Sequence, residues 1–206
     1  MKTIFIPAKV RSEVNKAKIL EISKKLPKTI SIAYSIQYQN IVFEIEKILS
    51  KNHEITKTMQ VLGCSKPKLS KTTQAILLVG SGRFHAISLA QETKLPIYIL
   101  EQNQLYKISK KDIETLEKKQ KASFLKFLHA NKIGILISTK PGQQNLKKAL
   151  EVKNKIKNKK SYLFLGDNIN SFEFENFKID SWINTSCPRL DMDSRIVNVS
   201  NLKKLD

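Results

Sequence analysis

The sequence contains very little cysteine, with Cys64 and Cys187 as the only two among 206 residues. A disulfide framework is therefore not expected, and two thiolates are fewer than the three or four ligands that zinc sites and iron–sulfur clusters usually take. Long apolar runs are also absent, and the short apolar stretch near the N-terminus is too short for a signal peptide. These absences favour a cytoplasmic protein with free thiols and no membrane contact.

Arginine is scarce as well, although the formal net charge is +19. Only four of the 37 basic residues are arginine, and the lysines are scattered along the predicted helices. Arginine is the preferred side chain for bidentate recognition of phosphates and bases. The charge therefore favours a solvated lysine-rich surface over a specific nucleic-acid site. A basic surface that meets an RNA-associated or acidic partner is the alternative.

Familiar catalytic patterns are missing from the sequence. No Ser–His–Asp order, zinc-ligand spacing or pair of carboxylates stands out. His53 and His129 lie in predicted helical or turn contexts without evident partners, so we interpret them as ordinary surface residues. We therefore assign no catalytic side chain.

Short apolar runs alternate with amphipathic segments along the chain, a pattern that is typical of βαβ units and mainly parallel sheets. We interpret the N-terminal residues up to 8 as a first strand and residues 197–206 as a solvated end. Further strands are predicted at residues 30–34, 75–79, 97–100, 133–137, 162–165 and 181–183, and helices at 12–26, 40–49, 85–92, 113–130 and 144–156.

A short repeat indicates two related halves. Residues 30–37 run into Gln39-Asn40 and a helical pattern, and residues 134–140 run into Gln143-Gln144-Asn145 and another. Each half then carries one cysteine. We predict an α/β fold of two similar small domains, each a mainly parallel sheet flanked by helices. The first domain is residues 1–104 with Cys64, and the second is residues 105–206, a linking helix and a domain with Cys187.

Two strand-to-helix turns are candidate binding loops. Residues 80–85 (GSGRFH) offer flexible glycines and a helix N-terminus that could receive an anion or carboxylate, and Arg83 and His85 favour a site over a bare turn. Residues 138–143 (STKPGQ) offer two hydroxyls, a lysine and an amide for a polar ligand, although a capped Pro-Gly turn is equally compatible. Neither turn has the spacing of a dinucleotide-binding or P-loop motif.

The two cysteines follow apolar runs, so each is expected at the end of a strand, facing a loop. Arg189 beside Cys187 is a cation of the kind that favours the thiolate form, which metal ligation and nucleophilic attack require. A lone cysteine is more often a small buried hydrophobe, and that interpretation suits Cys64 better than Cys187.

Six segments in order resemble one known family, the archaeal diphthamide synthases that make 2-(3-amino-3-carboxypropyl)histidine. They are residues 4–8, 35–37, 60–64, 80–85, 138–143 and 184–189. The resemblance implies three similar α/β domains, each giving one cysteine to a [4Fe–4S] cluster whose open iron binds S-adenosylmethionine. An electron donor reduces the cluster, and a 3-amino-3-carboxypropyl radical then adds to one histidine of elongation factor 2.

Carried over by position, the resemblance implies that Cys64 and Cys187 are iron ligands. It also implies a set of residues that line the S-adenosylmethionine site: Gln143, Arg189, Lys140, Gly80, Ser81, Gly82, His85 and Gln37.

The resemblance covers only the second and third domains of the family, so the first domain and its cysteine are not part of this sequence. A separate chain could supply that domain, the chain could pair with a full-length homologue, or it could be a truncated relative without catalysis. The predicted function is a subunit or partial form of the transferase. A non-catalytic accessory subunit and a basic RNA-binding protein are the alternatives.

Overall fold

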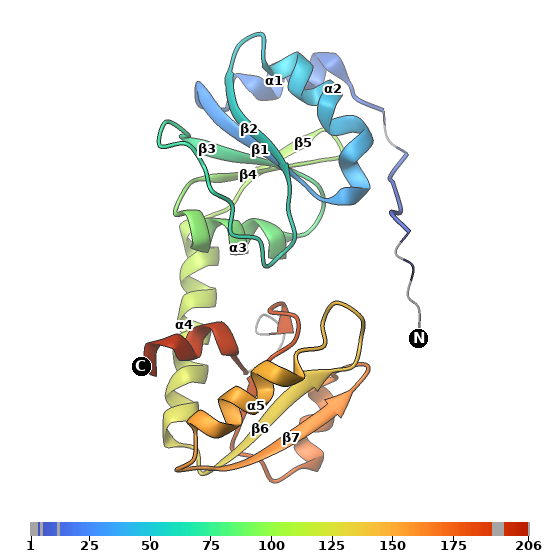
Figure 1. The fold of residues 1–206 in the computed structure, drawn as a ribbon. Coiled ribbons are helices and arrows are strands. Elements are labelled where there is room, and N and C mark those ends of the chain that lie inside the picture. The colour runs from blue at the N-terminus through green and yellow to red at the C-terminus, as the bar shows by residue number, and fades with distance from the viewer. Residues whose placement is uncertain (1–3, 5, 12, 191–195, 206) are drawn as a thin grey trace. The chain divides into compact units, whose positions relative to one another are not determined.

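The computed structural model describes residues 4, 6–11, 13–190 and 196–205. Its contacts divide the chain into two units, Met1–Ile113 and Glu114–Asp206 (Figure 1). The division lies within helix α4 (Lys110–His129), a little beyond the domain boundary after residue 104 that the sequence indicated. Among the described residues, no helix combines the length and the apolar character needed to span a membrane.

The first unit is built on one five-stranded sheet in the order β2-β1-β3-β4-β5. The first four strands are parallel, and β5 runs antiparallel to β4. The strands are β1 (Thr29–Tyr34), β2 (Glu54–Gln60), β3 (Ala75–Val79), β4 (Ile97–Glu101) and β5 (Gln104–Lys107).

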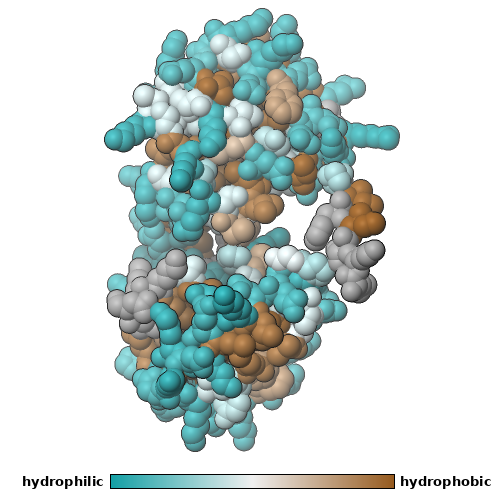
Figure 2. All heavy atoms as spheres, viewed as in Figure 1, coloured by the Kyte–Doolittle hydropathy of each residue, from teal (hydrophilic) through white to brown (hydrophobic). Residues whose placement is uncertain are grey.

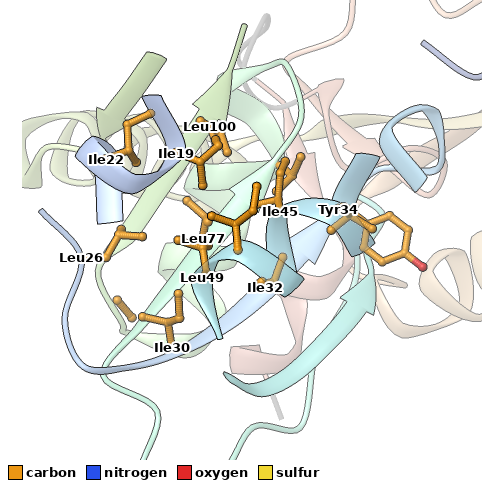
Figure 3. Packing of buried hydrophobic residues seen from close by; sticks show 14 residues of the cluster. Ile19, Ile22, Leu26, Ile30, Ile32, Tyr34, Ile45, Leu49, Leu77 and Leu100 are labelled. Carbon is orange, nitrogen blue, oxygen red and sulfur yellow. The ribbon is translucent and has the colours of Figure 1, made fainter. Parts of the chain in front are cut away.

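Helices cover this sheet, and its main core lies beneath two of them. Helices α1 (Lys16–Ser23) and α2 (Gln39–Leu49) pack together and share a cluster with alternate residues of β1 and β3 (Figure 3). Helix α3 (Arg83–Thr93) buries residues that are outside this cluster, and the short 3-10 helix η1 (Ile36–Tyr38) joins β1 to α2. Strands β1 and β3 are buried along their whole length, as central strands of a covered parallel sheet should be.

The second unit has a four-stranded parallel sheet in the order β7-β6-β8-β9. The strands are β6 (Lys132–Ser138), β7 (Lys160–Gly166), β8 (Ser181–Asn184) and β9 (Val197–Asn198), and the other helices are α5 (Leu146–Lys155), η2 (Ser171–Asn176) and η3 (Val199–Leu205). One face of the sheet packs on α4 and α5 through Phe127 and Val152. The other carries Trp182, which stacks on Phe174 with ring centroids 4.4 Å apart.

The two sheets share one strand order. Counted along the chain, β7-β6-β8-β9 repeats β2-β1-β3-β4, and the first unit adds β5 at its edge. The predicted α/β class, with two similar small domains, is therefore confirmed. Cys64 follows β2, the second strand of its unit, whereas Cys187 follows β8, the third strand of its unit. For this reason Cys187 lies further along the chain from the start of its repeat unit than Cys64 does.

Three predicted elements differ from the structure. Described residues 4 and 6–8 form no strand, and the side chains of Ile4 and Ile6 are 84% and 83% exposed. The first helix begins only at Lys16, because the side chain of Asn15 accepts a hydrogen bond from the Lys18 amide and caps it there. Residues 197–198 are a buried strand rather than the start of a solvated end, with Val197 2% exposed.

Besides β9, the sequence did not predict strands β2 and β5. Strand β2 is only half-buried and has a lysine in its middle, so it lacks a continuous apolar run. Strand β5 is a short exposed edge strand, joined to β4 by a tight turn in which Gln102 and Asn103 have positive φ. Edge strands give a weak sequence signal because they bury few side chains.

Candidate functional site

A cleft of about 200 Å³ lies in the second unit, at the carboxyl ends of β6, β7 and β8. In open α/β sheets this edge is where ligands bind. The cleft is lined by Ser138, Lys140, Gln143, Asp167, Asn168, Ile169, Cys187, Arg189 and Leu190. Four residues predicted from the sequence therefore meet here: Lys140, Gln143, Cys187 and Arg189.

The loop after β6 forms one wall of the cleft. The Ser138 hydroxyl accepts a hydrogen bond from the Lys140 amide at 3.2 Å and donates one to the Asp167 carbonyl at 3.3 Å. The Lys140 ammonium donates to the side-chain oxygen of Asn168, and the Thr139 hydroxyl donates to the Asp167 carboxylate. Gly142 supplies a φ of +77°, which glycine adopts without strain. The loops after β6 and β7 are thus bonded to each other.

The loop after β8 carries Cys187 as a half-buried free thiol. The Thr185 hydroxyl donates to the Leu136 carbonyl at 2.8 Å, and the Ser186 hydroxyl accepts from the Ser138 amide at 2.7 Å. These bonds attach the cysteine loop to strand β6, so Cys187 stands beside the loop that holds Lys140 and Gln143.

The side chains of this cleft suit a small zwitterionic ligand. Arg189 and Lys140 are exposed cations that could receive a carboxylate, and Arg189 can do so with two parallel N–H donors. The Asp167 carboxylate could receive an ammonium group, and Gln143 can both donate and accept. Asp167 and Asn168 were not predicted as site residues. Their position in the sequence could have predicted them, because these two polar residues directly follow the end of a parallel strand.

In the first unit, Cys64 is an exposed free thiol, so its interpretation as a small buried hydrophobe was wrong. The loop is held close to β1 and α3. The Val61 amide donates to the Tyr34 carbonyl at 2.8 Å, and the Leu62 amide donates to the Ser65 hydroxyl at 2.7 Å. A methyl group on Gly63 would lie 1.8 Å from a ring carbon of Phe84, so the loop rests on the ring that follows Arg83.

The turn at residues 80–85 lies at the same edge of the first sheet. Gly82 has a φ of +99° and immediately precedes α3. A methyl group on Gly80 would lie 3.2 Å from the Ser35 hydroxyl and 3.7 Å from the Tyr38 ring, so this turn adjoins the segment that holds Gln37. Ser81 and Gln37 are exposed, and the His85 ring lies 5.6 Å from the Phe84 ring. The predicted residues of this unit thus gather around β1, β2 and β3.

Arg83 has a structural role. Its guanidinium pairs with the Asp112 carboxylate at 2.5 Å. Ser109 and Asp112 cap α4 reciprocally: the Ser109 hydroxyl donates to Asp112 at 2.8 Å and accepts from the Asp112 amide at 3.1 Å. Hydrogen bonds from Ser109 and the nearby Arg83 hold the pKa of Asp112 below its ordinary value. Arg83 thus ties the 80–85 turn to the start of α4.

The thiols fit iron ligation individually but do not form a complete set. Both are free and lie in loops at the carboxyl edge of a sheet. Among the residues that the structure describes, no group of three or more His, Cys, Asp or Glu side chains could hold a metal ion. Iron–sulfur clusters take about four ligands in most sites. The described residues therefore offer two thiols, which are fewer ligands than such a cluster usually takes.

A family model described as "Putative diphthamide synthesis protein" matches residues 1–197. The 2-(3-amino-3-carboxypropyl)histidine synthase of Pyrococcus horikoshii is 28% identical over 206 residues, covering 93% of this chain and 60% of that protein. The synthase of the same name from Methanocaldococcus jannaschii is 30% identical over 213 residues, covering 96% and 58%. The chain thus spans about three-fifths of the length of these curated relatives.

The crystal structure of Dph2 from Pyrococcus horikoshii with a 4Fe-4S cluster superposes with a TM-score of 0.79 at 24% identity. The similarity covers 95% of this chain and 64% of that one. At this identity the superposition establishes a shared fold.

Proposed function

Because the chain belongs to the family of diphthamide synthesis proteins, we propose that it is a subunit or partial form of a 3-amino-3-carboxypropyl transferase. The donor in this proposal is S-adenosylmethionine, and the acceptor is the imidazole of one histidine of elongation factor 2. The observation that carries the proposal is the cleft of the second unit, where Cys187, Arg189, Lys140 and Gln143 line one space.

The cleft residues would hold the methionine portion of the donor. Arg189 and Lys140 would bind its carboxylate, and Gln143 would fix its orientation by hydrogen bonding. The Asp167 carboxylate, on the opposite loop, would bind its ammonium group. The bond between Lys140 and Asn168 keeps the lysine at the cleft before the ligand arrives.

Cys64 and Cys187 would be two thiolate ligands of a [4Fe–4S] cluster, and a partner would supply the third. When bound, the cluster supplies the electron that cleaves a C–S bond of S-adenosylmethionine. Gln37 and the turn with Gly80, Ser81, Gly82 and His85 would line the same site from the first unit. Their place at the edge that carries Cys64 supports this role.

The test is anaerobic reconstitution of the chain alone and together with a protein that carries a further cysteine-bearing domain of this family. The chain alone should bind little stable cluster, and the pair should bind about one cluster and transfer a labelled 3-amino-3-carboxypropyl group to elongation factor 2. Cys187→Ala and Cys64→Ala should each abolish transfer. A stable cluster with full activity from this chain alone would contradict the need for a partner.

Donor binding can be tested separately from the cluster ligands. Arg189→Ala and Gln143→Ala should raise the KM for S-adenosylmethionine by about tenfold or more, since each removes a hydrogen bond to a charged or polar group. Arg11→Ala and Gln144→Ala are matched controls at exposed positions that do not line the cleft, and they should leave the KM unchanged. An equal rise in KM for the two control variants would contradict the proposal that the cleft binds S-adenosylmethionine.

A non-catalytic accessory subunit is the second candidate, favoured by the incomplete ligand set among the described residues. In that case the chain would stabilise a full-length synthase or help it meet elongation factor 2. Cys64→Ala distinguishes the two candidates. Transfer is lost if Cys64 is a ligand, and it persists if the chain is a scaffold.

A further inference from the structure

We infer that Asn184 and Asn198 form a buried amide pair that positions the Cys187 loop at the cleft. The importance of this loop rests on the proposed function, whereas the hydrogen bonds belong to this chain alone. Asn184 ends strand β8, and Asn198 ends strand β9. The register of the two parallel strands sets these residues opposite each other. Their side chains are almost fully buried, with 1% and 6% of their surface exposed.

The two side chains bind the main chain at three successive residues. The Ser186 amide donates to Asn184 Oδ1 at 2.9 Å, and Asn184 Nδ2 donates to the Cys187 carbonyl at 2.8 Å. Asn198 Nδ2 donates to the Pro188 carbonyl at 2.9 Å. Side chains from the sheet therefore hold the main chain at Cys187 and at the residues directly before and after it.

The hydrogen bonds also determine the orientation of the two side-chain amide groups. A backbone N–H can only donate, so the atom of Asn184 that faces Ser186 is its oxygen, and its nitrogen faces the Cys187 carbonyl. The second N–H of that nitrogen donates to Asn198 Oδ1 at 2.7 Å, which leaves the Asn198 nitrogen for the Pro188 carbonyl. Each polar atom of the pair has a partner, so another side chain at either position would leave a buried group unpaired.

This arrangement gives the pair a positioning role. A metal ligand or substrate contact must be held within about 0.5 Å of its working geometry by residues that are themselves fixed. Asn184 and Asn198 line no part of the cleft, yet they hold the residue that does. They act through Cys187 and are positioning residues rather than catalytic ones.

The test measures the reactivity of Cys187 in the full chain without a cluster. In a Cys64→Ala background, Cys187 is the only thiol, and its alkylation rate by iodoacetamide at a fixed pH reports how the loop holds it. Asn198→Ala should raise that rate about fivefold, the change expected when one net hydrogen bond of restraint is lost. Asn198→Asp should act in the same direction, because a carboxylate oxygen would face the Pro188 carbonyl in place of a donor.

Two controls separate positioning from general destabilisation. Asn154→Ala makes the same chemical change at an exposed site on α5, and Val152→Ala loosens the core of the same unit. Both should leave the alkylation rate within about twofold of the parent, since neither removes a hydrogen bond of the loop. If the alanine variant does not fold, Asn198→Ser gives the same comparison with a shorter side chain that retains a hydroxyl.

An unchanged rate in the folded Asn198 variants would overturn the inference. So would an equal rise in Val152→Ala at matched thermal stability, because the effect would then follow stability rather than the amide pair. The assay uses neither cluster nor S-adenosylmethionine, so its outcome does not depend on the proposed transferase. In the reconstituted pair, the same Asn198 variants should alter the electron paramagnetic resonance signal of the reduced cluster.

Discussion

The two units share a strand order, yet their cysteines follow different strands. Cys64 follows β2, at the edge of its sheet, and Cys187 follows β8, between β6 and β9. The position equivalent to Cys187 in the first unit is the turn after β3 with Gly80, and the position equivalent to Cys64 in the second unit is the loop after β7 with Asp167. The two cysteine loops therefore lie at the same edge of their sheets but follow different strands of the repeat.

The two cysteine loops are also held in different ways. The loop of Cys64 is held by the main-chain amides of Val61 and Leu62 and by the contact of Gly63 with the Phe84 ring, and its thiol is exposed. The loop of Cys187 is held by two buried side-chain amides that bind residues 186–188, and its thiol is half-buried. The main chain at Cys187 is therefore bonded directly to buried side chains, whereas the contacts of the Cys64 loop are made by the neighbours of the cysteine. Substitutions in each unit test this contrast.

The largest effect is expected at Gly134 in the second unit. A methyl group there would lie 2.2 Å from the Trp182 ring, which is enclosed by Phe164 and Phe174 and has little room to move. Gly134→Ala should lower the free energy of unfolding of this unit by about 3 kcal/mol. Trp182 is the only tryptophan, so its fluorescence during urea unfolding follows this unit. The double variant with Trp182→Leu has no tryptophan and is therefore followed by circular dichroism, as is Gly134→Ala for comparison. It should recover part of the loss if the ring is the obstacle.

A smaller effect is expected from Gly63→Ala in the first unit. The methyl group would meet the Phe84 ring at 1.8 Å, but this ring is only half-buried and can swing aside. The cost should be roughly 1 kcal/mol, measured by circular dichroism during urea unfolding. Adding Phe84→Ala should remove the clash. A cost as large as that of Gly134→Ala would contradict the view that the Cys64 loop is the more loosely held.

The sequence predicted the two units well because most of their strands are continuous apolar runs in a covered parallel sheet. The apolar runs at β1, β3 and β6 strongly favour buried strands, and the polar residues that follow them mark the edge where we predicted ligand binding. The ends of the chain were misjudged for a physical reason. Strand β9 is two residues long, and Asn198 is a polar residue that is buried only because Asn184 faces it. Such a pairing depends on a tertiary partner and has no local sequence signal.

The smallest effect is expected from single carboxylates at the sheet ends. Hydrogen bonds from the amides of Lys132 and Asn131, at 2.7 and 3.0 Å, hold the pKa of Asp180 below its ordinary value of 3.8. Because the pKa of Asp180 is lowered in the folded state, its carboxylate stabilises the second unit at pH values above the ordinary pKa. This contribution is lost as the pH falls through the pKa of the folded state. Asp180→Asn should therefore destabilise the unit at pH 7 and match the parent in strong acid.

The measurement for Asp180 is the urea midpoint of Trp182 fluorescence at several pH values. Glu175→Gln is the matched control on an exposed site of the same unit. In the first unit, Asp112→Asn should behave similarly by circular dichroism, because its pKa is lowered by Ser109 and Arg83. A pH-independent difference between Asp180→Asn and the parent would show that the charge of Asp180 does not contribute.

Apolar side chains are exposed unevenly over the two units. Figure 2 shows a largely hydrophilic surface that is interrupted by an apolar area over α5 and β7. The large exposed apolar residues of these two elements are Leu146, Leu150, Tyr162 and Leu165. Strand β7 is also an edge strand with unpaired backbone groups on its outer side. Such edges pair readily with other strands, so this face is where self-association is expected at high protein concentration.

The pairing of β9 with β8 has a consequence for biosynthesis. Residues 197–198 leave the ribosome after Cys187, and only then can Asn198 bind the Pro188 carbonyl and Asn184. The first unit can fold from residues made much earlier, since its sheet is complete at Lys107. During synthesis there is thus an interval in which both thiols exist but only one loop has its final shape. In that interval Cys187 is not yet held by the amide pair of its own sheet.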